Sequence, residues 1–214
     1  MKHPRCRTLV FAKTPMPGRV KTRLHAVLEP EDCAALHARL VRLTLDKLTR
    51  PQLYPVELWC APDCGDAFFR DCRHDYELEL HAQAGDDLGQ RMHNALCRSL
   101  ETCDAAVLVG TDCPSLTRTD IDTACRQLLA GTDVVLGPAT DGGYYLVGLR
   151  QPHPELFTGI SWGRGEVLAQ TLARARQQAL QVYLLPRRDD LDTPADYRRF
   201  LGRDEASADI QGSA

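Results

Sequence analysis

Three features are scarce in this sequence of 214 residues, and each scarcity excludes a class of protein. No apolar run approaches the about 20 residues that span a bilayer. The run after the basic N-terminus, residues 8–12, is also too short for a secretion signal. The net charge is only −3, which gives no overall attraction to nucleic acid. The sequence therefore predicts a cytoplasmic protein without a membrane span or a nucleic-acid partner.

The third scarce feature is a paired cysteine motif. Nine cysteines occur, but none of them forms a Cys-x-x-Cys pair. Their odd number and scattered positions favour reduced cysteines that act as small core residues or surface thiols. The group of Cys60, Cys64, Cys72 and His74 has the spacing of no common zinc site, so structural zinc is not expected.

The composition is that of an ordinary globular protein, with 43% apolar and 26% charged residues. The length suits one sizeable domain and is short for two. We expect this domain to cover residues 1–203, and the polar residues 204–214 to form a flexible tail. The sequence leaves the oligomeric state open.

Strand and helix patterns alternate along the chain. The expected strands cover residues 7–12, 56–60, 76–81, 105–109, 133–136, 144–149 and 181–185. The expected helices begin at Pro30 and Pro194 and cover residues 87–100, 120–130 and 165–179. This order predicts a single α/β domain with a doubly wound, mostly parallel sheet and helices on both faces. Ligands of such sheets bind at the carboxyl ends of the strands.

The loop after the first strand has the composition of a phosphate-binding loop. Gly18 allows the backbone to approach a ligand, and two prolines restrict the loop beforehand. Arginine and lysine donate hydrogen bonds to phosphate oxygens in complementary geometries. The loop supplies four such cations, Lys13, Arg19, Lys21 and Arg23. It lacks the glycine spacing of a Walker A or dinucleotide-binding loop, so we expect neither of those architectures.

Carboxylates after later strands are candidate metal ligands. Asp112 directly follows the expected strand at residues 105–109, and Asp192 stands between the last strand and the last helix. Mg²⁺ and Mn²⁺ bind such oxygen ligands together with substrate phosphates. A turn or helix-entry role for Asp112, and a helix-end role for Asp192, remain the alternatives.

Three further stretches are candidate contacts with the donor or the acceptor. Residues 85–92 follow a strand and offer Gly85, Asp86 and Arg91 to a nucleotide. Residues 141–143, the sequence Asp141-Gly142-Gly143, suit either a ligand site or a hairpin turn. Trp162 is a candidate for an acceptor pocket or for ordinary packing.

Together these stretches resemble the GT-A, or nucleotide-diphospho-sugar transferase, superfamily. They resemble in particular the bacterial glycosyltransferase-like family related to 2-phospholactate guanylyltransferase. The resemblance covers about residues 7–200 and rests on the order of residues 11–24, 85–92, 110–116, 141–149 and 191–196. It implies that the cationic loop lies near phosphates, that Asp112 binds a metal and that Asp192 is a second ligand. Thr111-Asp112-Cys113-Pro114 departs from the Asp-x-Asp of many glycosyltransferases and is closer to the single aspartate of related nucleotidyltransferases.

The resemblance implies a Mg²⁺- or Mn²⁺-dependent transferase with a nucleotide-activated donor. In glycosyl transfer from a nucleotide sugar to a small-molecule acceptor, the metal held by Asp112 and the cationic loop with Lys21 would neutralise the departing nucleoside diphosphate, so Lys21 and Asp112 are the candidate catalytic residues. The alternative is nucleotidyl transfer from a nucleoside triphosphate to a phosphorylated small molecule, with release of pyrophosphate. A lesser alternative is a nucleotide-binding module without catalysis.

Overall fold

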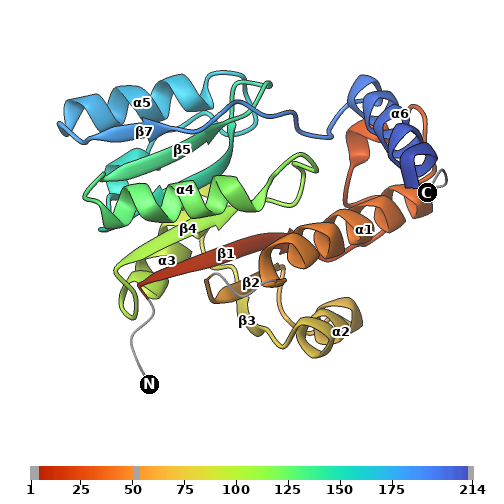
Figure 1. Ribbon diagram of the computed structural model, residues 1–214, viewed down its shortest axis with the longest axis horizontal. Coiled ribbons are helices and arrows are strands. Elements are labelled where there is room, and N and C mark those ends of the chain that lie inside the picture. Colours follow the sequence, from red (N-terminus) through yellow and green to blue (C-terminus); the bar gives the residue numbers. More distant parts are fainter. Residues whose placement is uncertain (1–4, 51–53, 212–214) are drawn as a thin grey trace.

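The computed structural model describes residues 5–50 and 54–211 as one α/β domain (Figure 1). Seven strands form a single sheet in the order β3-β2-β1-β4-β6-β5-β7. The strands are β1 (Cys6–Lys13), β2 (Val56–Ala61), β3 (Glu79–Ala82), β4 (Ala105–Val109), β5 (Val134–Pro138), β6 (Tyr144–Leu149) and β7 (Val182–Leu184). Only β6 runs antiparallel to its neighbours, β4 and β5. The expected mostly parallel sheet is therefore confirmed.

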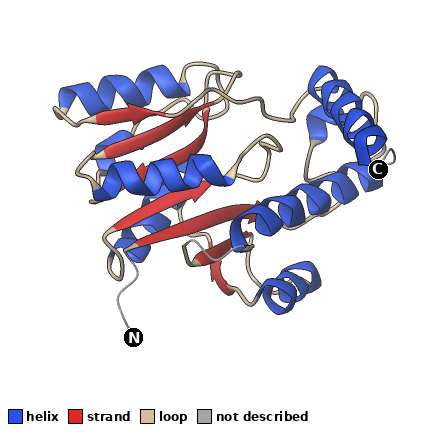
Figure 2. Cartoon of the chain, viewed as in Figure 1, coloured by secondary structure: helices blue, strands red, loops and turns tan. Residues whose placement is uncertain are grey.

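Helices cover both faces of the sheet (Figure 2). They are α1 (Pro30–Thr49), α2 (Ala67–Tyr76), α3 (Leu88–Leu100), α4 (Arg118–Leu129), α5 (Val167–Gln177) and α6 (Pro194–Gln211), with short 3-10 helices at Thr22–Leu24 and Pro154–Leu156. None of the helices in the described part of the chain has the length and apolar character needed to cross a bilayer.

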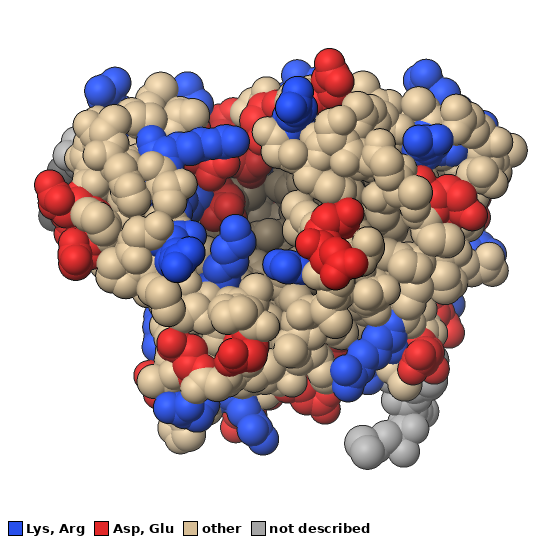
Figure 3. Space-filling model, turned by 180° about the vertical axis from the view of Figure 1, so that it is seen from behind, with Lys and Arg blue, Asp and Glu red and all other residues tan. Residues whose placement is uncertain are grey.

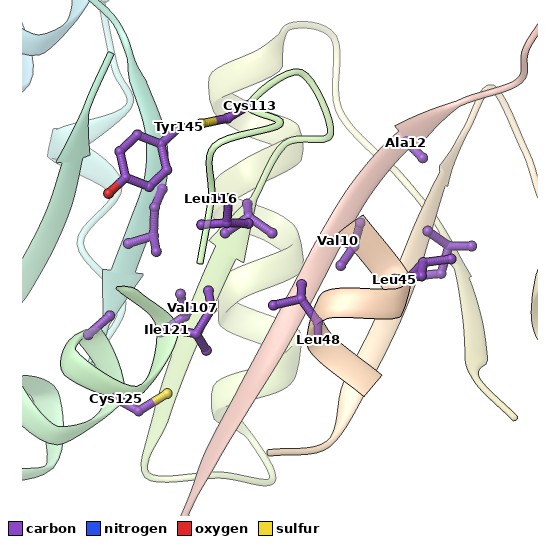
Figure 4. Close-up of a cluster of buried hydrophobic side chains, with 14 of the residues drawn as sticks. Val10, Ala12, Leu45, Leu48, Val107, Cys113, Leu116, Ile121, Cys125 and Tyr145 are labelled. Carbon is purple, nitrogen blue, oxygen red and sulfur yellow. The ribbon is translucent and has the colours of Figure 1, made fainter. Parts of the chain in front are cut away.

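The core divides at the sheet because successive strand side chains point to opposite faces. In β1, Val10 packs with α1, α2 and α4 on one face, as part of the cluster in Figure 4. Its neighbours Leu9 and Phe11 pack with α3 and α5 on the other face. A third apolar cluster joins Leu24 and the first half of α1 to α6, which lies beside this part of α1 in Figure 1.

One expected strand is wrong in its first half. Residues 76–81 were predicted as a strand from their alternating pattern, but Tyr76 ends α2 and only Glu79–Ala82 is a strand. The Asp66 side chain caps α2 by accepting from Phe68 N, and Phe69 and Cys72 are fully buried on its inner face. These tertiary contacts outweigh the local alternation. The other expected elements are present with small shifts at their ends.

The prediction that the cysteines are reduced is wrong for one pair. Cys6 of β1 and Cys125 of α4 form a disulfide with a Cα–Cα distance of 6.1 Å. Cys125 belongs to the buried cluster in Figure 4. The two residues are 119 positions apart, so only the packing of α4 on the sheet brings them together. The other seven cysteines are free.

The start of α4 is tied to the segment after β7 by a buried ion pair. Arg188 donates from Nε to Asp120 Oδ2 at 2.7 Å and from its terminal nitrogen to Oδ1 at 2.9 Å. Asp120 also accepts from the Thr117 backbone N–H at 2.8 Å, completing a capping box. Arg188 N donates to Pro138 O at 3.0 Å, so this pair fixes the chain two residues before Asp190.

The bounds of the last helix do not test the predicted limits of the domain. The last helix, α6, starts at Pro194 as expected, and Thr193 and Asp196 form its capping box. The helix extends to Gln211, past the predicted domain limit at residue 203. The flexible character of residues 204–214 stays a prediction.

We expect Asp120→Asn to lower the free energy of unfolding by about 3 kcal/mol. This is the lower end for breaking a buried ion pair, because Arg188 keeps some access to water. Urea denaturation of the intact protein measures the loss. Arg126→Gln removes an exposed ion pair of the same helix and should cost about 0.5 kcal/mol or less. Equal losses in the two variants would contradict the anchoring role of Asp120.

Candidate functional site

A cleft of about 490 Å³ lies beyond the carboxyl ends of β1 and β4. Strand order reverses between these two strands, and such switch points leave a crevice in open α/β sheets. In Figure 3 a hollow with basic and acidic side chains around it opens on one face of the molecule. The lining residues of the cleft come from β1 and its loop, α1, α3, the loop after β4, β6 and the segment before α6.

All four cations of the predicted phosphate loop line this cleft. A fifth, Arg91, joins them from α3. A second hollow of about 450 Å³ adjoins the first and shares Lys13, Arg19 and Arg91 with it. The structure therefore brings together the residues predicted to bind phosphate, Lys13, Arg19, Lys21, Arg23 and Arg91.

The tip of the loop is a tight turn with an open backbone. Arg19 N donates to Met16 O at 3.0 Å, which closes a four-residue turn around Pro17 and Gly18. Gly18 has a φ of +74°, a conformation that suits glycine at this turn position. No atom lies within 4 Å of the place where a Cβ would stand. The glycine therefore serves the turn and leaves the backbone accessible.

Lys21 is the point at which three segments of the site meet. Its side chain is only 3% exposed, and its ammonium lies 2.6 Å from Asp112 Oδ1 and 3.3 Å from Asp192 Oδ1. The same nitrogen donates to Leu191 O at 2.6 Å. Its contact with Asp112 lacks the alignment of a hydrogen bond and is an ion pair. The two predicted metal ligands are thus neighbours of one cation.

The two aspartates are held by their backbones and keep open carboxylates. Leu191 N donates to Asp112 O at 2.7 Å, which joins the loop after β4 to the segment before α6. The side chains of Asp112 and Asp192 are 48% and 35% exposed. Arg23 also approaches Asp192, at 3.4 Å. Oxygens of this kind, accessible from a cleft, are suited to a hard divalent cation.

Asp190 adds a further carboxyl group to the cleft. Burial, followed by the neighbouring carboxylates of Asp141, Asp112 and Asp192, raises the pKa of Asp190 to about 7, against the opposing effect of Lys21. The site therefore holds more carboxylates than its buried ammonium can neutralise.

His37 and Gln83 are among the lining residues that were not predicted from the sequence. His37 of α1 is buried and donates from Nε2 to Lys13 O at 3.0 Å, and burial lowers its pKa. Gln83, which follows β3, donates to Trp59 O at 2.9 Å. Both side chains hold the ends of strands β1 and β2 in place. Nothing in their local sequence distinguishes them from surface or core positions.

The stretch at residues 85–92 reaches the cleft through Arg91 and Leu88. Gly85 has a φ of +139°, and a Cβ there would lie 2.8 Å from Gln90 Cβ. Its carbonyl accepts from Arg91 Nε at 3.0 Å, which orients the guanidinium. Gly85 and Asp86 do not line the cleft, so their contact with a nucleotide stays a prediction.

The Asp141-Gly142-Gly143 stretch forms a turn packed against the loop before α5. Asp141 Oδ1 accepts from Gly143 N at 2.8 Å. Gly142 has a φ of +89°, and a Cβ there would lie 2.0 Å from Gly165 O. Gly142 is therefore required for a close backbone crossing. Neither glycine lines the cleft, and their predicted ligand contacts remain predictions.

Trp162 packs behind the cleft wall. Its ring meets Tyr144 edge-on at a centroid distance of 6.4 Å. A Cβ on Gly89 of α3 would lie 2.7 Å from Trp162 Cζ2, so the indole covers the start of this helix. Trp162 does not line the cleft, while Tyr144 does. An acceptor contact of Trp162 stays a prediction.

A second acidic group, formed by Glu57, Glu79 and His81, has potential ligand atoms within 4.8 Å of one another. Glu57 is already neutralised by an ion pair with Arg7. It also accepts from Trp59 Nε1 at 3.1 Å and Ser99 Oγ at 2.9 Å. Because these donors occupy its oxygens, this group is a poorer metal site than the carboxylates at the cleft.

Comparisons with known proteins assign the family. Residues 44–164 match the family model described as an uncharacterized protein conserved in bacteria, DUF2064. The chain belongs to this family. No curated protein sequence matches the chain.

Solved structures confirm the fold of nucleotide-diphospho-sugar transferases. A Desulfovibrio desulfuricans protein, described as a candidate nucleotide-diphospho-sugar transferase, is 34% identical, with a TM-score of 0.79 over 88% of this chain and 82% of its own. A Leptospira borgpetersenii cytidylyltransferase is 14% identical, with a TM-score of 0.60 over 91% and 84%. The Mycobacterium tuberculosis glucosyl-3-phosphoglycerate synthase, in complex with Mn²⁺ and UDP, is 10% identical, with a TM-score of 0.54 over 94% and 76%.

We expect Gly142→Ala to lower the free energy of unfolding by at least about 3 kcal/mol, because the new methyl group meets backbone atoms as well as an unfavourable φ. Gly163→Ala is the matched control, with a φ of +77° and nothing within 4 Å of the new Cβ. It should cost only about 1 kcal/mol. Chemical denaturation compares the stabilities of the two variants. A similar loss of stability in both would contradict the requirement for glycine at the close backbone crossing of Gly142.

Proposed function

We propose that this chain is a metal-dependent transferase that uses a nucleotide-activated donor, with a nucleotide sugar as the donor and a small molecule as the acceptor. The observation that carries this proposal is the meeting of Asp112 and Asp192 at one cation, on a cleft whose loop side is lined by five Lys and Arg side chains. Domain 1–203 would contain the whole site.

The donor set at Lys21 fits Mg²⁺ or Mn²⁺. The ammonium is held by two carboxylates and by the backbone oxygen of Leu191, all of them hard oxygen donors. A bound divalent ion would supply charge neutralisation for the departing phosphate group. Asp112 and Asp192 would hold it, and no soft ligand takes part.

The cationic side of the cleft would bind the donor's phosphates. Arg19 and Arg91 offer forked donors, while Lys13 and Lys21 supply point charges. Such preformed donors stabilise the negative charge that grows on the leaving group. The turn at Gly18 would offer accessible backbone of the same loop to the donor.

The opposite wall supports a neutral acceptor. It is formed by residues of β4, β6 and the loop after β4, and these lining residues include no Lys or Arg. Leu108, Leu146 and Val147 give it an apolar surface. A phosphorylated acceptor would need cations on this side, whereas a sugar and a neutral nucleophile would not. The description of the 34% identical Desulfovibrio protein supports the same choice.

Nucleotidyl transfer is the second candidate, and the number of cations favours it. Five Lys and Arg residues exceed what the roughly two negative charges of a nucleotide sugar require, and they suit a triphosphate. A CMP-2-keto-3-deoxy-manno-octonic acid synthetase in complex with CTP has the same fold, with a TM-score of 0.59 at 12% identity. In this case the leaving group would be pyrophosphate.

We expect Asp112→Asn to reduce metal-dependent turnover of the donor by about 100-fold or more, because a lost metal contact removes several kcal/mol of charge stabilisation. Release of nucleoside phosphates measured by chromatography tests this. Asp75→Asn on α2, which removes only surface contacts with Arg42 and His74, should keep the parent rate. Unchanged turnover in Asp112→Asn, with circular dichroism showing a folded protein, would remove Asp112 from the site.

The choice between the two reactions is tested with the donor. Nucleotide sugars and nucleoside triphosphates are screened with Mg²⁺ or Mn²⁺ by thermal shift, since a ligand at 100 times its Kd adds about 2.7 kcal/mol of stability. We expect a nucleotide sugar to stabilise the protein and to yield a nucleoside diphosphate. Pyrophosphate as product would establish the second candidate. Metal-independent binding without turnover of any donor would instead indicate a non-catalytic module.

A further inference from the structure

The ammonium of Lys21 occupies the space between the two proposed metal ligands. It is nearly excluded from water, and the oxygens around it are Asp112 Oδ1 at 2.6 Å, Leu191 O at 2.6 Å and Asp192 Oδ1 at 3.3 Å. Because both carboxylate oxygens lie within ion-pair distance of one nitrogen, an ion that bridges them would take the place of the ammonium.

Resting on the function proposed above, we propose that Lys21 and the divalent metal exchange places. In the metal-free state the ammonium keeps Asp112 and Asp192 together. The metal then takes over their oxygens, and the released ammonium moves into the cleft, where it binds the donor's phosphates. Metal binding would thereby deliver a phosphate-binding cation at the same time.

Charge favours this exchange. Asp112 and Asp192 together carry two negative charges, so the one ammonium between them leaves part of this charge unneutralised. A divalent ion interacts twice as strongly as an ammonium with each carboxylate at equal distance. The guanidinium of Arg23 does not replace it, because its side chain is 60% exposed and lies 3.4 Å from Asp192 alone.

The geometry lets the side chain move while the backbone stays. Lys21 has a φ of +50° and stands directly before the 3-10 helix Thr22–Leu24, and Leu24 N donates to Lys21 O at 2.8 Å. The two carboxylate-bearing segments are joined by the bond from Leu191 N to Asp112 O. Only the flexible four-carbon stem has to turn toward the cleft that Lys21 already lines.

The exchange is tested on the intact protein by acetylation with acetic anhydride under native conditions, followed by mass spectrometry. The sequence has only four lysines, so each site is resolved. We expect Lys21 to react slowly without metal and at least tenfold faster in saturating Mn²⁺. Lys47, whose ammonium donates to Pro114 O, is the internal control and should react at the same rate in both conditions.

Failure of this inference is distinguishable from failure of the proposed function. Mn²⁺ binding is followed separately by electron paramagnetic resonance in the parent, Asp112→Asn and Asp192→Asn. One outcome is that the parent binds Mn²⁺, that either variant weakens this binding, and that Lys21 stays protected from acetylation. In that case the exchange is wrong and the proposed metal site stands. If the parent binds no Mn²⁺, the metal dependence of the proposed function fails and the exchange fails with it.

Two charge variants distinguish competition between the Lys21 ammonium and Mn²⁺ for one position from simple charge repulsion of the metal. Lys21→Met should bind Mn²⁺ at least tenfold more tightly than the parent when no nucleotide is present, because the competing ammonium is gone. Arg23→Gln also removes one positive charge beside Asp192, but from outside the ligand set, and should change the affinity less than threefold. An equal increase in Mn²⁺ affinity in both variants would overturn the proposed exchange.

Discussion

The ion pairs and hydrogen bond of Lys21 are the interaction on which the arrangement of the site depends. One buried ammonium joins the loop after β1, the loop after β4 and the segment before α6, through two carboxylates and a backbone oxygen. Burying an ammonium is costly unless it is paired and its hydrogen-bonding capacity is used. The loop containing the other three cations is therefore held beside the aspartates by the partners of Lys21, together with an exposed contact between Arg23 and Asp192.

The fold supplies those partners from two segments that are far apart in the sequence. β1 and β4 are adjacent and parallel, so the loops that follow them emerge at one edge of the sheet. The third segment follows β7, which lies three strands away from β4 in the sheet, and it needs its own anchor. Asp120 provides it by holding Arg188, and the backbone of Arg188 continues to Asp190 and Asp192. The position of Asp192, a proposed metal ligand, thus depends on a buried pair outside the cleft.

Patterns within one segment were sufficient to predict most of this fold. The strand at β4, the helix from Pro30 and the capping box at Thr193 follow from local periodicity and capping chemistry, and they are present as expected. The cationic loop and Asp112 were found in the same way, because each follows a buried strand. The disulfide between Cys6 and Cys125 was not, since it exists only when α4 packs on β1. His37 was missed for the same reason.

The wall of the cleft that is formed by β4, β6 and the loop after β4 shows where local sequence patterns stop being informative. Leu108, Leu146 and Val147 are buried strand residues whose sequence pattern is that of a core, yet they also line the cleft. They reach it because β6 runs antiparallel and its first residues lie beside the end of β4. A residue that packs the sheet and faces the ligand is constrained by both roles. Under the proposed function, specificity for the acceptor would lie in side chains that sequence reasoning assigns to the core, while the charged motifs would determine how the donor is held.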